Sequence, residues 1–131
     1  MTKKRIGLVH YTYPPIIGGV EKVVFDHAQL FSRYDYEVTV FAGEGHSDNS
    51  RVKLKIIPEF KSLRVTDPDL FEKTLNENIF SDEFISLSNK ILEKIEKEFE
   101  DIDVFIIHNI LNLTLNLCLN RALAEYIKKL K

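Results

Sequence analysis

The chain has 131 residues, of which 44% are hydrophobic and 29% charged, as expected for one ordinary globular domain spanning residues 1–131. Its formal net charge is −2, and no block of like charge is long enough to form a nucleic-acid-binding arm. A single cysteine excludes a disulfide framework and favours a cytoplasmic protein. No apolar run reaches the ~20 residues that cross a bilayer, although peripheral membrane contact stays open.

The first half of the chain shows strand and helix signals in turn. A short apolar run predicts a strand over residues 5–11, and apolar residues at helical spacing predict a helix over residues 19–33. β-Branched and aromatic residues predict a second strand over residues 36–43. Residues 52–57 alternate in polarity, which predicts a half-exposed third strand at an edge of the sheet.

The second half begins with a weaker signal, in which Asp67-Pro68-Asp69 can start a short helix that ends near Asn76. Apolar spacing over residues 82–99 predicts a long amphipathic helix. Residues 103–108 are nearly all apolar, as expected for a central parallel strand. A tight loop over residues 109–112 then leads to a last helix that ends near Leu130.

This order of elements is typical of an α/β domain with a mainly parallel sheet and helices on both faces. Right-handed crossovers give the strand order 3-2-1-4 of a Rossmann-like domain. Because the connection between the second and third strands is short, the third strand could instead run antiparallel to the second. Ligands of such sheets bind beyond the carboxyl ends of the strands, where the strand order reverses. That point, the switch point of the sheet, lies between the first and fourth strands.

The loop before the first helix reads Tyr11-Thr12-Tyr13-Pro14-Pro15-Ile16-Ile17-Gly18-Gly19-Val20-Glu21. Its two prolines favour an extended segment. Gly18 and Gly19 permit a positive φ and lack a Cβ, so another group can approach the backbone closely. The helix that follows directs unpaired N–H groups and a positive dipole end at the same place, which favours phosphate. The alternative is that the glycines only make the turn.

Residues 13–24, Tyr-Pro-Pro-Ile-Ile-Gly-Gly-Val-Glu-Lys-Val-Val, directly after a strand that ends in His-Tyr, resemble the start of the retaining glycosyltransferases of GT-B fold family 4. The resemblance implies the front part of the acceptor-side domain of an enzyme that transfers a hexosyl group from a nucleotide sugar to a glycan, lipid or small-molecule acceptor. Gly18 and Gly19 would then lie against the donor diphosphate. Glu21 could share that role, although a surface salt bridge between Glu21 and Lys22 is an equal alternative.

His108 is the main candidate for chemistry, because it ends the fourth strand at the expected switch point and imidazole titrates near neutral pH. The resemblance implies that His108 orients or deprotonates the acceptor, or hydrogen-bonds the sugar. A histidine that merely caps the strand end is the alternative. Asn109 follows it directly, and His10 ends the first strand at the same side of the sheet.

Further candidate acceptor contacts are Tyr11, His46 in the loop after the second strand, and Asn112. The asparagines at positions 109, 112, 116 and 120 are spaced by three, four and four residues, which would place their amides on one face of the last helix. The alternative is a solvent face with an asparagine N-cap. His27 falls on the apolar face of the first helix and is expected to be a packed core residue.

No histidines or carboxylates have the spacing of a zinc site on one helix, and the dinucleotide and P-loop motifs are missing. No cofactor is expected beyond the nucleotide sugar as co-substrate. The family's donor-binding domain carries two glutamates eight residues apart, a pair this chain lacks, so we expect no glycosyl transfer by the chain alone. A non-enzymatic α/β interaction or regulatory module is the competing interpretation, and a homo-oligomer stays open.

Overall fold

A computed structural model describes residues 2–16 and 18–130 of the chain. These residues fall into two compact units. The first unit consists of Met1–Phe60 and Asp101–Asn109, and the second of Lys61–Glu100 and Ile110–Lys131. Residue 17, which belongs to the proline- and glycine-rich loop, lies outside the described residues.

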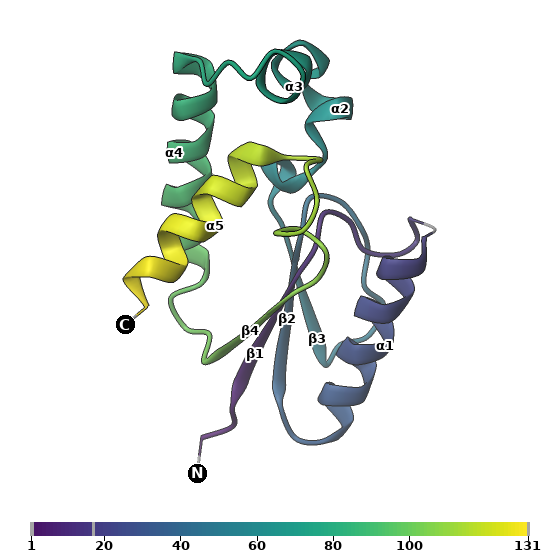
Figure 1. Ribbon diagram of the computed structural model, residues 1–131. Helices are drawn as coiled ribbons and strands as arrows, with labels where there is room; N and C mark the ends of the chain where they lie inside the picture. Colours follow the sequence, from purple (N-terminus) through teal and green to yellow (C-terminus); the bar gives the residue numbers. More distant parts are fainter. Residues whose placement is uncertain (1, 17, 131) are drawn as a thin grey trace. The chain divides into compact units, whose positions relative to one another are not determined.

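The first unit is built on a four-stranded parallel sheet in the order β3-β2-β1-β4 (Figure 1). Its strands are β1 (Arg5–Val9), β2 (Glu37–Ala42), β3 (Val52–Ile56) and β4 (Val104–Ile107). The predicted fold class and strand order are therefore confirmed.

The third strand is an edge strand, as predicted, but it runs parallel to β2, so the antiparallel alternative is wrong. Residues 43–51 make the return without a helix. A strand of five or six residues is roughly 17–20 Å long. An extended segment as long as residues 43–51 reaches roughly 30 Å, which is enough to return along a strand of that length.

The fourth strand lies at the edge that the predicted order 3-2-1-4 gives it, so the interpretation of its apolar run as a central strand is wrong. β4 pairs with β1, and within the described residues it lies at the edge of the sheet opposite β3. Val104 is exposed, and the other three residues of β4 are only half-buried. The apolar run was interpreted as a central strand, but apolar side chains report what packs on the faces of a strand and carry no information about its edges.

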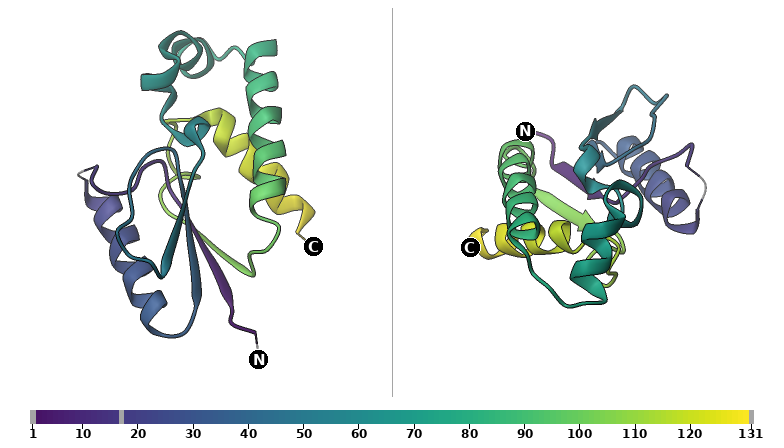
Figure 2. Two further views of the ribbon diagram at one scale, coloured as in Figure 1. Left: turned by 180° about the vertical axis from the view of Figure 1, so that it is seen from behind. Right: turned by 90° about the horizontal axis from the view of Figure 1, so that it is seen from above.

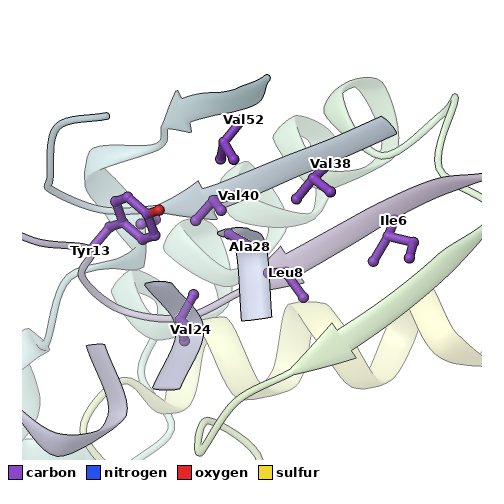
Figure 3. Packing of buried hydrophobic residues seen from close by; sticks show 9 residues of the cluster. Ile6, Leu8, Tyr13, Val24, Ala28, Val38, Val40 and Val52 are labelled. Carbon is purple, nitrogen blue, oxygen red and sulfur yellow. The ribbon is translucent and has the colours of Figure 1, made fainter. Parts of the chain in front are cut away.

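The helix α1 (Gly19–Arg33) has the predicted bounds and packs along one face of the sheet (Figure 2). Successive strand side chains point to opposite faces, so Ile6 and Leu8 of β1 share the face that α1 covers. Figure 3 shows the resulting core between helix and sheet. Its buried residues are Ile6, Leu8, Tyr13, Val24, Ala28, Val38, Val40, Ala42 and Val52.

The second unit contains four helices, α2 (Leu63–Thr66), α3 (Pro68–Leu75), α4 (Asp82–Glu98) and α5 (Leu117–Lys129). Side-chain caps explain where all four of them begin. Asp67 accepts from the N–H of Leu70, and Ser81 accepts from the N–H of Phe84, which satisfies donors that the first helical turn leaves free. The predicted short helix after Asp67 and the long helix after Ser81 are confirmed.

The last helix begins later than predicted, at Leu117. Asn109 adopts a left-handed φ of 47°, Asn112 lies in an exposed turn, and Asn116 is the N-cap. Only Asn120 lies inside α5, so the predicted face of four amides is wrong. The N-cap alternative is correct for Asn116.

The rest of the second unit agrees with the sequence. Helices α4 and α5 pack against each other (Figure 1), and the rings of Phe99 and Tyr126 meet edge to face at 5.4 Å. Cys118 is buried and free, as expected, and burial raises the pKa of its thiol. Over residues 2–16 and 18–130, no helix has both the length and the apolar character that a membrane span requires.

Candidate functional site

The carboxyl ends of β1 and β4 lie side by side, because Val9 is paired with Ile107 in the parallel ladder. Each strand is followed directly by a histidine. The N–H of His108 donates to the carbonyl of Val9 at 2.9 Å, and Nδ1 of His10 donates to the carbonyl of His108 at 2.8 Å. The structure therefore brings His10 and His108 together at the switch point of the sheet.

The side chain of Glu21 joins this pair from the first turn of α1. Its Oε1 accepts a hydrogen bond from the hydroxyl of Thr12 at 2.6 Å and lies 3.6 Å from Nε2 of His10. Nδ1 of His10 carries the proton that it donates to a carbonyl, so Nε2 carries a second proton only when the ring is charged. A charged His10 would complete an ion pair with Glu21.

The environment of Glu21 favours its ionised form. Burial acts to raise the pKa of this carboxyl, but hydrogen bonds from Thr12 and from its own backbone amide, together with His10, hold the pKa below its usual value. The carboxylate thus lies at the positive end of α1. The anion at this helix terminus is one of the chain's own side chains.

Gly18 leaves room for this carboxylate. A Cβ on Gly18 would lie 2.2 Å from Oε2 of Glu21, whereas a Cβ on Gly19 would meet nothing within 4 Å. Gly18 is extended, with a φ of 179°, a conformation open to any residue, and neither glycine is among those with positive φ. Neither glycine uses the positive φ that it permits, but the expected close approach to a glycine backbone occurs at Gly18.

The alternative of a surface salt bridge between Glu21 and Lys22 is also wrong. Lys22 pairs with Asp26 one turn further along α1, at 2.7 Å, while Glu21 turns inward to Thr12 and His10. Consecutive helix residues point in directions about 100° apart, so neighbours in sequence seldom face each other. The role of Thr12 was missed, since one hydroxyl in a loop carries no periodic signal.

His108 is half-buried, and its Nε2 atom is buried without a hydrogen-bond partner among residues 2–16 and 18–130. Its ring centroid lies 5.3 Å from that of His27 on α1, and Nδ1 of His27 is likewise buried with no partner in the described part of the chain. Burial lowers the pKa of His108, and the neighbouring His27 and His10 lower it further. A neutral imidazole of this kind can accept a proton or a hydrogen bond.

His27 is partly buried on the side of α1 that faces the sheet, close to the packed core position that was expected for it. Its contact with His108 was not predicted. The signal was present, because Val20, Val24 and His27 follow one helical face that covers the sheet, and His108 ends a strand of that sheet.

Among the other predicted acceptor contacts, His10 is the one that the structure places against His108. His10 and Tyr11 are buried, with 4% and 5% of their surface exposed, and burial raises the pKa of Tyr11 to about 12. Neither side chain offers a surface to an acceptor in this structure. Asn109 is exposed beside His108. Asn112 belongs to the second unit.

His46 lies in the exposed loop between β2 and β3. Its Nε2 pairs with Oδ1 of Asp48 at 2.8 Å, and its backbone N–H donates to the carbonyl of Pro14. His46 therefore belongs with the proline segment rather than with His108. Within residues 2–16 and 18–130, no three side chains of the His, Cys, Asp or Glu type gather closely enough to hold a metal ion.

Comparison of the chain with protein-family models and with curated proteins gives no match.

Proposed function

We propose that this chain is the acceptor-side part of a nucleotide-sugar-dependent retaining glycosyltransferase of GT-B family 4. It would provide one wall of the active site, and the donor-binding domain would provide the other. The chain alone would not transfer a sugar, because half a site lacks the preorganised charges that stabilise the transition state.

One observation carries the proposal: the ends of β1 and β4 and the start of α1 converge. There His108, His10 and Glu21 are linked through a 2.8 Å hydrogen bond and a 3.6 Å contact. A parallel sheet of this order hosts many functions, so the fold alone would be analogy. The Pro-Pro-x-x-Gly-Gly-x-Glu loop at the convergence supports this family in particular.

The residues divide into separate roles under this proposal. Gly19 exposes open space at the start of α1, which a diphosphate could enter beside the N–H groups of the first turn. Glu21 holds the loop by bonding Thr12. His108, neutral at physiological pH, would accept a proton or a hydrogen bond from a hydroxyl group. His10 is buried and would position the backbone of His108.

The proposal includes a cytoplasmic location, which the single buried thiol supports because cytoplasmic thiols stay reduced. The partners would be a nucleotide sugar and an acceptor. No cofactor and no nucleic acid form part of the proposal.

The test is a titration of the 15N-labelled chain with UDP, GDP and ADP, followed by NMR. We expect at least one nucleotide to shift the amide signals of Gly19 and Glu21, with weak, millimolar affinity. Gly19→Val should abolish the shifts while leaving the remaining spectrum intact, because the space beside Gly19 is open. Leu30→Ala, on an exposed part of the same helix, is the matched control.

Unchanged Gly19 and Glu21 signals with all three nucleotides would contradict the proposal, and so would equal binding by Gly19→Val. Either result would favour the non-enzymatic module. Sugar transfer by the 131-residue chain alone would refute the division of the active site between two domains.

A further inference from the structure

A groove in the first unit lies apart from the convergence of β1, β4 and α1. The loop before α1, the middle of α1 and the loop between β2 and β3 enclose about 460 Å³, within the range of small-molecule sites. His108, Gly18 and Gly19 are not among the residues that line it.

The two loops that form the groove are fixed to each other. Three backbone hydrogen bonds of 2.8 Å join them: Gly43 N–H to Tyr11 O, Tyr13 N–H to Glu44 O, and His46 N–H to Pro14 O. Gly45, with a φ of 148°, comes so close to Tyr13 that a Cβ would lie 2.6 Å from the Cβ of Tyr13. The groove is thus preformed, which lowers the entropic cost of binding.

Part of the groove lining is apolar and rigid. It consists of Pro14, Pro15 and Phe25. Phe25 is 37% exposed, and the centroid of its ring lies 6.1 Å from that of the buried Tyr13 ring. Proline rings have no rotamers to lose, and an aromatic ring has few. A rigid apolar surface suits the C–H face of a sugar ring.

The rest of the lining carries hydrogen-bond donors and acceptors, from Gln29, Asn49, His46 and Asp48. Nδ2 of Asn49 donates a hydrogen bond of 2.5 Å to Oε1 of Gln29. Oδ1 of Asn49 accepts a hydrogen bond of 2.9 Å from the backbone N–H of Arg51. The amide of Asn49 is therefore held in one orientation. Amides, an imidazole and a carboxylate together can both donate to and accept from hydroxyl groups.

The charges of the groove disfavour an anionic ligand. Among the described residues that line it, none is lysine or arginine. The Asp48 carboxylate is almost fully exposed at the groove, so it would repel a phosphate or a uronic acid.

We propose that this groove binds a neutral sugar ring, and that the acceptor of the proposed glycosyl transfer is a neutral glycan. The naming of that sugar as the acceptor rests on the proposed function. The apolar side chains stack against the ring, and the polar side chains bind its hydroxyl groups.

The experiment is an NMR titration of the labelled chain with maltotriose, cellotriose and mannotriose, with trigalacturonate as the anionic comparison. We expect at least one neutral trisaccharide to shift the side-chain amides of Gln29 and Asn49 and the ring protons of Phe25. Phe25→Ala should abolish binding. Asp48→Ala, at an exposed position that does not affect folding, should weaken it about tenfold. Glu44→Ala, in the same loop but outside the lining, should bind normally.

The inference is overturned if no neutral trisaccharide shifts these signals, if trigalacturonate binds more tightly, or if Asp48→Ala binds as well as the unchanged chain. Nucleotide shifts at Gly19 test the proposed function separately. Trisaccharide shifts without nucleotide shifts would leave a sugar-binding groove and remove the glycosyltransferase. The reverse result would retain the enzyme and remove the groove.

Discussion

Glu21 shows how one side chain can organise a loop. Its carboxylate accepts hydrogen bonds from the hydroxyl of Thr12 and from its own backbone N–H, and it faces His10. These contacts tie the end of β1 to the start of α1. Because Gly18 provides no side-chain cap, Glu21 supplies the negative group that stabilises a helix N-terminus.

A double-mutant cycle on Gly18 and Glu21 tests this connection. Gly18→Ala places a Cβ where Oε2 of Glu21 lies, so the carboxylate must move away. Glu21→Gln removes its charge, and we expect each variant to lose about 1 kcal/mol of unfolding free energy. Because both changes disrupt the same interaction, the double variant should lose less than their sum in urea denaturation.

The matched control for this cycle is Gly19→Ala, which should leave stability nearly unchanged because the space beside Gly19 is open. Additive losses would show that Gly18 and Glu21 act independently.

His108 gives the first unit a dependence on pH. Its pKa is lowered from the usual 6.5 by burial and by the neighbouring His27 and His10, so the unfolded chain binds a proton more readily than the folded chain. The contribution of His108 is therefore present above pH 6.5 and is lost as the pH falls through the lowered folded pKa. Denaturation measured across this interval should show stability that falls with acidity.

The variant His108→Asn should flatten this part of the pH profile. Asn112→Ala is the control, because Asn112 lies in an exposed turn and has no titratable group. An identical slope in the His108 variant would mean that another group causes the acid sensitivity.

Helix starts in the second unit depend on single polar side chains. Asn116 is fully buried and does two things at once. Its Oδ1 accepts the N–H of Leu119 at 3.0 Å, and its Nδ2 donates to the carbonyl of Lys61 at 2.8 Å. One amide thus caps α5 and ties this helix to the segment that precedes α2.

We predict that Asn116→Ala lowers the free energy of unfolding by about 2 kcal/mol, because it removes both a helix cap and a buried hydrogen bond. Urea denaturation of the chain measures this loss. Asn112→Ala should change stability by less than about 0.5 kcal/mol, since Asn112 lies in an exposed turn. Equal effects of the two variants would contradict the assignment of Asn116 as the cap.

At the scale of the whole molecule, the chain has two compact units, and the first of them contains both proposed sites. The switch point with His108 and the groove with Phe25 are built from residues 1–60 and 101–109. Residues 101–109 return to the sheet from far along the chain and supply β4. The candidate site therefore depends on one long-range strand pairing.

The amino-acid sequence by itself determined the fold class, the bounds of α1, the strand order and the meeting of His10 with His108. Local periodicity and the handedness of crossovers suffice for these features. The tertiary structure alone decided the parallel direction of β3, the inward turn of Glu21, the late start of α5 and the groove beside Phe25. Each of these depends on which distant groups meet in space, such as Glu21 with Thr12 or Asn116 with Lys61, and a periodic pattern contains no record of such partners.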